Sequence, residues 1–366
     1  MPKIAMIQAN SSCGSLDMTD NSAENACSGP VRAAPAWREG TIDNGVLIGR
    51  RGQLFLAGGA HAVLGYVTGE MDVPSQSYAN FNSNVIQRAA WSKARAARYL
   101  HVIFPDKQSV LVDDYPLAPP ICLGDKYLDS AGQAQADILY LKEDLRQGPD
   151  GAFLRTDTHL SDSGLARAAD AIARRFTDIS MSEMTGKLRQ APSETRDHCG
   201  DLGSKLQPRM TAPEAFLTAN WPLRYYTNNV SRNNGMVDIW FSPATEGGHR
   251  LLIFGDSFGR GMARFLSSSF REVLFLRTQY FHLDIVDQMR PTHIITETVE
   301  RYLTFIEPDR NRPSFHMYPF LGASEGTVPG REFAEAFSAM LSYPRPPYQR
   351  FVANIQQNHR PASAPT

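Results

Sequence analysis

The sequence lacks the features that mark membrane proteins and secreted precursors. It contains no apolar run of the ~18 residues that a membrane-spanning helix needs, so no transmembrane segment is expected. Residues 1–30 are polar and lack the apolar stretch of a secretory signal. The chain as written therefore predicts a cytoplasmic protein.

Cysteine is scarce, and the charges are balanced. The four cysteines, at positions 13, 27, 122 and 199, form no CxxC pair, which excludes a zinc ribbon and favours unrelated thiols. Lys and Arg total 37 against 38 Asp and Glu. Because no basic stripe or polybasic segment stands out, neither a nucleic-acid partner nor binding to a membrane surface is expected.

The composition changes along the chain and predicts three segments. Residues 1–40 are rich in Ser, Asn, Ala and Gly without apolar periodicity, which predicts a flexible N-terminal arm. Residues 41–308 contain the periodic apolar segments, and the apolar content is enough to bury a substantial core in one large domain or two small ones. Residues 309–366 are rich in Pro and Arg, which predicts an extended C-terminal wrap ending in a disordered tail.

Short apolar runs alternate with helical patterns within the predicted domain. The clearest helix has apolar residues at helical spacing and Ser161 as its N-cap. The expected strands are 46–48, 53–56, 99–104, 137–141, 152–159, 251–254, 272–276 and 292–296; the expected helices are 84–100, 161–176 and one beginning after Ser257. Residues 178–248 read as irregular and polar. The alternation predicts an α/β fold, a parallel sheet with helices on both faces.

Ser257 lies in the sequence Gly-Asp-Ser, between a wholly apolar strand and a helical pattern. At such a turn, a serine hydroxyl lies beside the free N–H groups and the positive end of the helix dipole. The position suits a nucleophile whose backbone forms part of an oxyanion hole. The alternative is a plain turn in which the serine is the helix N-cap.

A serine nucleophile needs a base, and the base needs an orienting acid. No histidine after Ser257 has an Asp three residues before it, but Asp157-Thr158-His159 ends an expected strand upstream. Two residues apart in an extended chain, Asp157 and His159 project to the same side. The alternatives are a surface turn or part of a metal site; without an HExxH motif, no metal is expected. Lys107 reads as a solvated lysine.

Several motifs in this order resemble the alginate O-acetyltransferase family, the AlgX/AlgJ type of SGNH-hydrolase-like proteins. Besides Asp-Thr-His and Gly-Asp-Ser-Phe, these are "GRRGQLFL", "VIFPDKQSV", "GDLGSKL" and "ITETVERYL", together spanning roughly residues 45–305. The resemblance implies an SGNH-hydrolase-like, flavodoxin-like sheet, with Ser257 as nucleophile, His159 as base and Asp157 as orienting acid. Gln53 and Leu160 depart from the family pattern. The Asn of ordinary SGNH enzymes is absent, so the second oxyanion donor is unassigned.

The resemblance also implies a function. We expect an O-acetyltransferase that acts on a bacterial polysaccharide or oligosaccharide through an acetyl-serine intermediate. The acetyl donor is a co-substrate, no cofactor is needed, and a membrane-bound acyltransferase is the partner that could supply the acetyl group. Family members usually work in the periplasm, which would require that a leader was removed. The alternatives are a carbohydrate O-acetyl esterase and a non-catalytic polysaccharide-binding or assembly protein.

Three further residues are candidates for substrate binding. Arg277 follows an expected strand and could bind an acidic sugar, although a plain surface arginine is the alternative. Trp221 and Tyr225 lie in the irregular region, where aromatic faces suit the C–H faces of sugar rings. The alternative is that both aromatic residues only pack a long loop.

Overall fold

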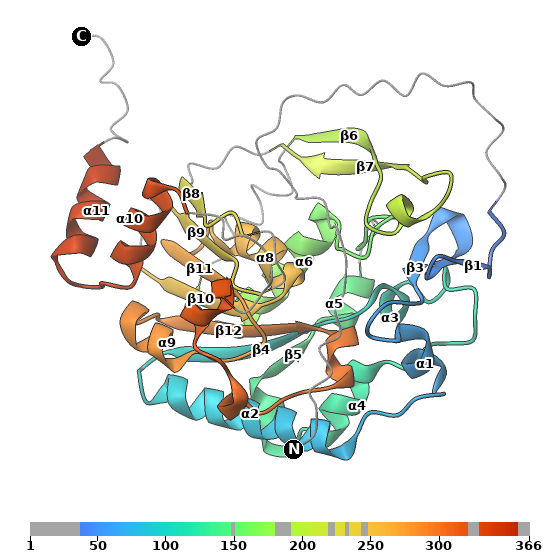
Figure 1. Cartoon of the computed structure of the whole chain (residues 1–366), viewed down its shortest axis with the longest axis horizontal. Coiled ribbons are helices and arrows are strands. Elements are labelled where there is room, and N and C mark those ends of the chain that lie inside the picture. The colour runs from blue at the N-terminus through green and yellow to red at the C-terminus, as the bar shows by residue number, and fades with distance from the viewer. Residues whose placement is uncertain are drawn as a thin grey trace, which may run out of the picture.

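The apolar segments form a seven-stranded central sheet in the computed structural model (Figure 1). The strand order is β5-β4-β12-β10-β11-β9-β8. The first five strands in this order are parallel, and β9 and β8 form an antiparallel edge. The bounds are β4 (Arg98–Phe104), β5 (Ile138–Tyr140), β8 (Arg224–Thr227), β9 (Val237–Phe241), β10 (Arg250–Gly255), β11 (Glu272–Arg277) and β12 (His293–Val299).

The structure describes residues 37–147, 151–179, 192–218, 224–230, 234–242, 248–320 and 329–357. Most of the predicted arm, residues 1–36, and the last nine residues of the predicted extension lie outside these ranges.

Helices cover both faces of the sheet, as the alternating pattern predicts. On one face, α6 (Asp162–Arg175) and α8 (Ser257–Leu266) pack on Leu251 and Ile253 of β10. On the other, α9 (Leu283–Met289) packs on Leu252 and Phe254, while α2 (Ser75–Lys93) and α4 (Leu123–Ser130) cover β4 and β5 (Figure 1). Successive residues of the buried strand β10 therefore pack alternately into the hydrophobic cores on the two faces of the sheet. The predicted α/β, SGNH-hydrolase-like fold is confirmed.

Smaller elements surround this sheet. The predicted strands near the start of the domain are confirmed as β2 (Val46–Ile48) and β3 (Leu54–Leu56), which form a small sheet with β1 (Ile42–Asp43). The other elements are α1 (Val63–Thr68), α3 (Lys107–Val110), α5 (Lys142–Arg146), β6 (Ser193–His198), β7 (Ala212–Leu217), α10 (Arg331–Met340), α11 (Pro346–Gln357), and the 3-10 turns η1 (Arg50–Gly52), η2 (Gly132–Asp137), η3 (Gly203–Lys205), η4 (Glu300–Thr304), η5 (Asp309–Asn311) and η6 (Phe315–Phe320).

Four expectations about secondary structure are wrong. The helix expected at 84–100 is α2, which begins earlier, after Pro74, and ends at Lys93. Residues 152–159 form turns and bends with a single β-bridge, because their polar groups bond to one another and to neighbouring loops. The region 178–248 contains the β6–β7 hairpin and the buried strand β9. Residues 331–357 form two packed helices rather than an extended wrap, because their apolar residues recur at helical spacing.

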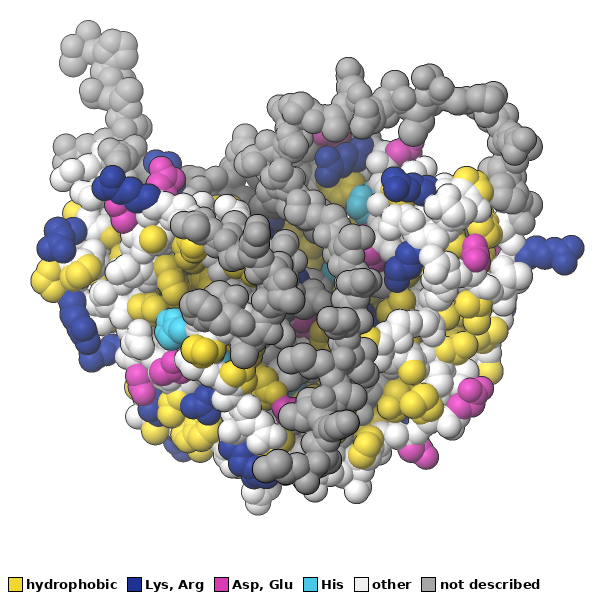
Figure 2. Space-filling model, viewed as in Figure 1, with side chains coloured by type: hydrophobic (Ala, Val, Ile, Leu, Met, Phe, Trp, Pro, Cys, Tyr) yellow, Lys and Arg dark blue, Asp and Glu magenta, His cyan; other side chains and the backbone are white. Residues whose placement is uncertain are grey.

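The described surface agrees with the balanced composition. On the face shown in Figure 2, Lys and Arg side chains are spread around the edge with Asp and Glu side chains between them. Among the helices that the structure describes, none is long and apolar enough to cross a membrane.

Candidate active site

Ser257 is the first residue of α8 and lies directly beyond the carboxyl end of β10. Asp256, not the serine, is the N-cap of the helix, since its Oδ1 accepts the Phe258 N–H at 2.8 Å. The serine hydroxyl is therefore not used for capping. The alternative that Ser257 is merely a helix N-cap is wrong.

The structure brings His159 to Ser257 and Asp157 to His159. His159 Nε2 lies 2.9 Å from Ser257 Oγ, and His159 Nδ1 lies 2.7 Å from Asp157 Oδ1. The ring also packs on Phe258, with centroids 5.2 Å apart. An imidazole held in this way has one nitrogen on a carboxylate and the other on a hydroxyl, which is the arrangement of a serine nucleophile, its base and an orienting acid.

A bend, and not a strand, aligns Asp157 with His159. Asp157 Oδ1 accepts the backbone N–H of His159 at 2.9 Å as well as its ring nitrogen. This two-residue side-chain turn curls the chain so that the carboxylate lies against the ring. Asp157 and His159 are therefore brought together by this turn, and not by the extended chain that the sequence predicts.

A second segment binds the other oxygen of Asp157. Asp157 Oδ2 accepts from the Asp201 N–H at 3.1 Å and lies 3.2 Å from His198 Nε2. Burial alone would raise the pKa of Asp157, but the hydrogen bonds from His159 and His198 outweigh it and hold this pKa well below its usual range. Asp157 is thus an ionised acceptor with donors on both oxygens.

Gly200 and Asp201 place this segment against the bend. A Cβ on Gly200 would lie 2.5 Å from Asp157 Cβ and from the Thr156 carbonyl oxygen, so only glycine fits there. The Asp201 carboxylate accepts from the N–H and the hydroxyl of Thr158, at 2.8 and 2.5 Å. The sequence signal for this contact is the Gly-Asp-Leu motif; His198 carries no comparable signal and is missed by sequence reasoning.

The charges around His159 favour the protonated form of its ring. Burial lowers the pKa of His159, but the hydrogen bond and charge of Asp157, together with the charge of Asp201, more than offset this and raise it. Asp201 Oδ2 lies 3.9 Å from His159 Nδ1. The two carboxylates therefore stabilise the imidazolium that forms when the ring accepts a proton.

Lys107 is buried, which contradicts its interpretation as a solvated lysine. Its Nζ donates to the carbonyl oxygens of Leu154, Arg155 and Asp157 at 2.6, 2.8 and 3.2 Å. Burial lowers the pKa of Lys107 to about 7, although three acceptors match the three N–H donors of the charged ammonium. The side chain fixes the backbone that leads into the Asp157 bend.

Glu297 of β12 accepts hydrogen bonds from the backbone of the turn that contains Ser257. Its Oε2 accepts the N–H groups of Asp256 and Gly259 at 2.9 and 3.0 Å. A Cβ on Gly255 or Gly259 would lie 2.3 or 2.5 Å from this oxygen, so both glycines make room for it. Burial and the charge of Asp256 raise the pKa of Glu297 well above its usual range.

The two residues that follow β12, Glu300 and Arg301, connect it to the segment that contains Lys107. Glu300 Oε2 accepts from the Asp106 N–H and the Ser109 hydroxyl at 2.9 and 2.6 Å. Arg301 pairs with Asp106 at 2.5 Å, and its guanidinium lies 5.2 Å from the centre of the Phe258 ring. The Glu-Arg pair of the "ITETVERYL" motif therefore positions the start of α3 and the ring on which His159 packs.

One backbone donor at the turn is available for an oxyanion. The N–H groups of Asp256, Phe258 and Gly259 each have a carboxylate acceptor. Among the described N–H groups of this turn, that leaves Ser257 at the positive end of α8. The second oxyanion donor stays unassigned.

The three predicted substrate-binding residues have different positions. Arg277 ends β11 in register with Gly255, so it lies at the same sheet edge as Ser257. The hydroxyl of Tyr225 is bonded to Asp238 and Arg260, at 2.7 and 3.0 Å, so the protein itself uses it. Trp221 lies outside the described residues.

Asp157, His159 and Asp201 also have ligand atoms within 4.8 Å of one another, as a metal site would require. Both carboxylates, however, already accept hydrogen bonds from the Asp157 bend and its neighbouring segment. Their observed partners explain this cluster without an ion.

The chain was compared with known proteins. Residues 66–278, more than half of the chain, match the family model described as "SGNH hydrolase-like domain, acetyltransferase AlgX". This range contains Asp157, His159 and Ser257. A comparison with curated protein sequences returned no match.

Among solved structures, Bacillus cereus PatB1 shows a similar fold, and two others match with lower scores. Bacillus cereus PatB1 with a sulfonyl adduct has a TM-score of 0.51 and 11% identity, covering 66% of this chain and 93% of that chain. The O-acetyltransferase domain of Pseudomonas putida AlgJ has a TM-score of 0.45 and 16% identity, covering 74% and 96%. Pseudomonas aeruginosa AlgX has a TM-score of 0.42 and 10% identity, covering 74% and 64%.

Proposed function

Because this chain belongs to the SGNH-hydrolase-like acetyltransferase family of AlgX, we propose that it transfers acetyl groups to carbohydrate hydroxyls through Ser257, His159 and Asp157. The observation that carries the proposal is the position of His159 between a carboxylate at 2.7 Å and a serine hydroxyl at 2.9 Å. Both distances are within the reach that proton transfer requires.

The first half-reaction loads the enzyme. Ser257 Oγ attacks the carbonyl carbon of the acetyl donor while His159 Nε2 takes the hydroxyl proton. The Ser257 N–H donates to the oxyanion of the tetrahedral intermediate, and Asp157 stabilises the imidazolium. When the intermediate collapses, the bond to the leaving group breaks, the leaving group takes the proton from His159, and acetyl-serine remains.

The second half-reaction transfers the acetyl group. A sugar hydroxyl gives its proton to His159 Nε2 and attacks the acetyl carbonyl. The bond to Ser257 Oγ then breaks, and the serine takes the proton back. Because the His159 side chain is 31% exposed, water can reach the same position, so hydrolysis competes with transfer. This observation makes a carbohydrate O-acetyl esterase the second candidate.

The acceptor in this proposal is a bacterial polysaccharide or oligosaccharide, and a membrane-bound acyltransferase is a candidate supplier of the acetyl group. Arg277 is a candidate for contacting the acceptor, since it lies at the sheet edge that carries Ser257. Tyr225 is a weaker candidate because its hydroxyl is bonded within the protein.

Intact-mass analysis after incubation with an activated acetyl ester tests the proposal. We expect one added acetyl group on the wild type and none on Ser257→Ala. A suitable oligosaccharide should speed the loss of this adduct and appear as an acetylated product. If all the acetyl appears as free acetate with every oligosaccharide, the protein is an esterase. If no adduct forms and ester is not turned over, the non-catalytic alternative replaces both enzymes.

A further inference from the structure

A second cluster of potential metal ligands lies at the amino ends of the parallel strands, whereas Ser257 lies at their carboxyl ends. It consists of Asp178, which follows α6, His249, which precedes β10, and His293, the first residue of β12. His249 and Ser257 flank the same strand, so the strand rise separates them by roughly 25 Å. Neither the proposed reaction nor any contact of the Ser257 site involves this cluster.

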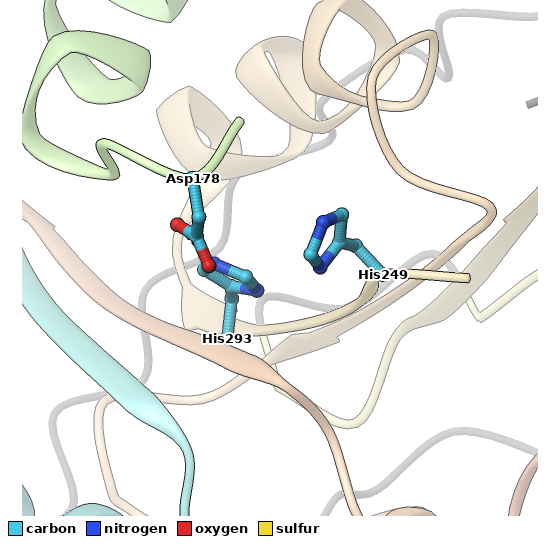
Figure 3. A group of neighbouring side chains, drawn as sticks. All are labelled: Asp178, His249 and His293. Atoms are coloured by element: carbon cyan, nitrogen blue, oxygen red, sulfur yellow. Dashed lines mark hydrogen bonds and ion pairs between the residues drawn. The ribbon is translucent and has the colours of Figure 1, made fainter. Parts of the chain in front are cut away.

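The three residues can reach one ion. One ligand atom from each lies within 4.8 Å of the other two, and the side chains approach one another from three separate segments (Figure 3). Around a tetrahedral zinc ion, ligand atoms are about 3.4 Å apart, given zinc–nitrogen bonds of about 2.1 Å. His293 Nε2 and Asp178 Oδ1 are already 3.2 Å apart. The ligand atom of His249 lies within 4.8 Å of the other two, so a small movement of this partly buried side chain would complete the set.

Outer partners orient two of the three side chains. Arg98 Nε binds Asp178 Oδ2 at 3.0 Å, which leaves Oδ1 directed at His293. Thr292 Oγ1 lies 2.8 Å from His293 Nδ1, on the side of the ring away from Asp178. Metal-binding residues commonly have such partners, which fix the ring and the carboxylate in place.

The hydrogen bonds around Thr292 suggest which His293 nitrogen is free. The Thr292 hydroxyl lies 3.1 Å from the Arg250 carbonyl and 2.8 Å from His293 Nδ1, and its single proton can go to only one of them; when it donates to the carbonyl, Oγ1 accepts from His293 Nδ1–H. In this tautomer, the bare Nε2 faces a carboxylate oxygen, and a cation between them removes the repulsion. The opposite tautomer would donate Nε2–H to Asp178 and would need no ion, and the experiment below separates the two cases.

The surroundings of His293 also suit a metal ligand. Its ring is 1% exposed and lies edge-on to Phe176 and Phe270, at centroid distances of 4.8 and 5.2 Å. Apolar walls on one side and polar ligands on the other limit the access of water to a bound ion. Two imidazoles and a carboxylate are a donor set that binds zinc, with water as a fourth ligand.

We propose that Asp178, His249 and His293 bind a divalent transition-metal ion of the zinc class. The ion would join the end of α6 to the starts of β10 and β12. Since α6 begins just after His159, the ion would fix the far end of the helix that follows the base. The ligands come from positions 178, 249 and 293, so no short spacing in the sequence reveals them.

Cobalt titration of the full chain tests this site. After chelator treatment, we expect the wild type to bind one Co²⁺ with the visible absorption of a tetrahedral site, and Zn²⁺ to displace it and raise Tm. His249→Asn and Asp178→Asn change side chains that have access to solvent. Each should weaken Co²⁺ binding by more than about a hundredfold, which is more than the loss of a residue that only orients a ligand would cause. The matched control, His316→Asn, alters an exposed histidine outside the cluster and should bind like the wild type.

Three outcomes would overturn the proposal. The first is a wild type that binds no cobalt, which the opposite tautomer predicts. The second is unchanged binding in His249→Asn. The third is binding that survives both cluster variants but disappears in His159→Gln, which would place the ion at the Asp157, His159 and Asp201 group instead.

Discussion

The His159 ring contacts three side chains of the site: the nucleophile Ser257, the orienting acid Asp157 and the aromatic ring of Phe258. Its Nε2 faces the serine, its Nδ1 faces the carboxylate, and its ring packs on Phe258. Single substitutions at this scale can therefore separate the chemical roles from the fold.

Ser257→Ala removes the atom that accepts the acetyl group. We expect ester turnover to fall at least about a thousandfold, because loss of a serine nucleophile typically has an effect of this size. The far-ultraviolet circular dichroism spectrum should not change. Ser268→Ala, at a serine whose hydroxyl donates to the Phe265 carbonyl, is the matched control. Near-wild-type turnover in a folded Ser257→Ala protein would contradict the role of the serine.

The rate of Ser257 acetylation should depend on pH through His159. The neutral ring accepts the proton, and the pKa of His159 is raised above 6.5. The rate should therefore be constant at high pH and fall as the pH drops through an inflection above 6.5. Because Asp201 helps to raise this pKa, Asp201→Asn should move the inflection downward, measured by stopped-flow acylation.

Asp197→Asn serves as the control for this pH profile, since Asp197 is exposed on the neighbouring strand. An inflection that stays in place in Asp201→Asn, or that moves equally in Asp197→Asn, would show that Asp201 does not act on the ring.

At the scale of elements, the turn from β10 to α8 depends on Glu297. Glu297→Ala leaves the N–H groups of Asp256 and Gly259 without acceptors, which should cost about 1–3 kcal/mol for each buried donor. Glu297→Gln keeps an acceptor oxygen on a side chain of the same shape, so it should stay within about 1 kcal/mol of the wild type. Urea unfolding measures both. Equal destabilisation by the two changes would show that the acceptor oxygen of residue 297 does not hold the turn.

The Asp157 bend depends on Lys107. Lys107→Met removes the ammonium donor from three carbonyl oxygens, of which the Arg155 carbonyl keeps the Leu54 N–H, and frees the backbone before His159. We expect acylation to slow at least about tenfold, because small misplacements of a base are costly. Lys126→Met, at a surface lysine 3.8 Å from Asp72, should acylate normally. If the two variants acylate equally fast, Lys107 does not position the bend.

Sequence reasoning finds those elements whose apolar pattern is long or uninterrupted. β10, the first half of β12 and α6 are predictable because their buried apolar residues form an uninterrupted run or recur at helical spacing. β9 is missed because it is short, carries Asp238 at its second position and lies in a polar region. The site is predictable where motifs mark it. His198 lies in no motif, and Glu297 lies in the "ITETVERYL" motif, but the contacts of both are created only by the folded chain.

At the scale of the whole molecule, the C-terminal helices cover the amino end of the sheet. Arg250 and Glu272 form a buried ion pair at 2.6 Å, and the rings of Tyr343 and Tyr348 lie 4.0 and 5.3 Å from the Arg250 guanidinium. The hydroxyl of Tyr348 also bonds to Glu272. Phe333, among the apolar residues of α10, packs in the core beneath β10 and β11.

Removal of residues 331–366 should therefore unfold or destabilise the domain. The truncation uncovers a buried ion pair and removes several apolar side chains worth about 2 kcal/mol or more each. We expect Tm to fall by at least about 10 °C, or the protein to be insoluble. A chain ending at Gln357 is the control and should melt like the wild type. An unchanged Tm after the longer truncation would show that these helices are a separate unit.

The position of α10 and α11 also affects the order of events during synthesis. The last strand of the sheet ends at Val299, and the helices that cover Arg250 extend to Gln357. At ribosomal speeds of roughly 5–20 residues per second, the intervening chain takes roughly three to twelve seconds to make. The sheet can therefore assemble while its amino end is still open to water and to chaperones. The charged side chains of Arg250 and Glu272 at that end then stay accessible to water until α10 and α11 pack over them.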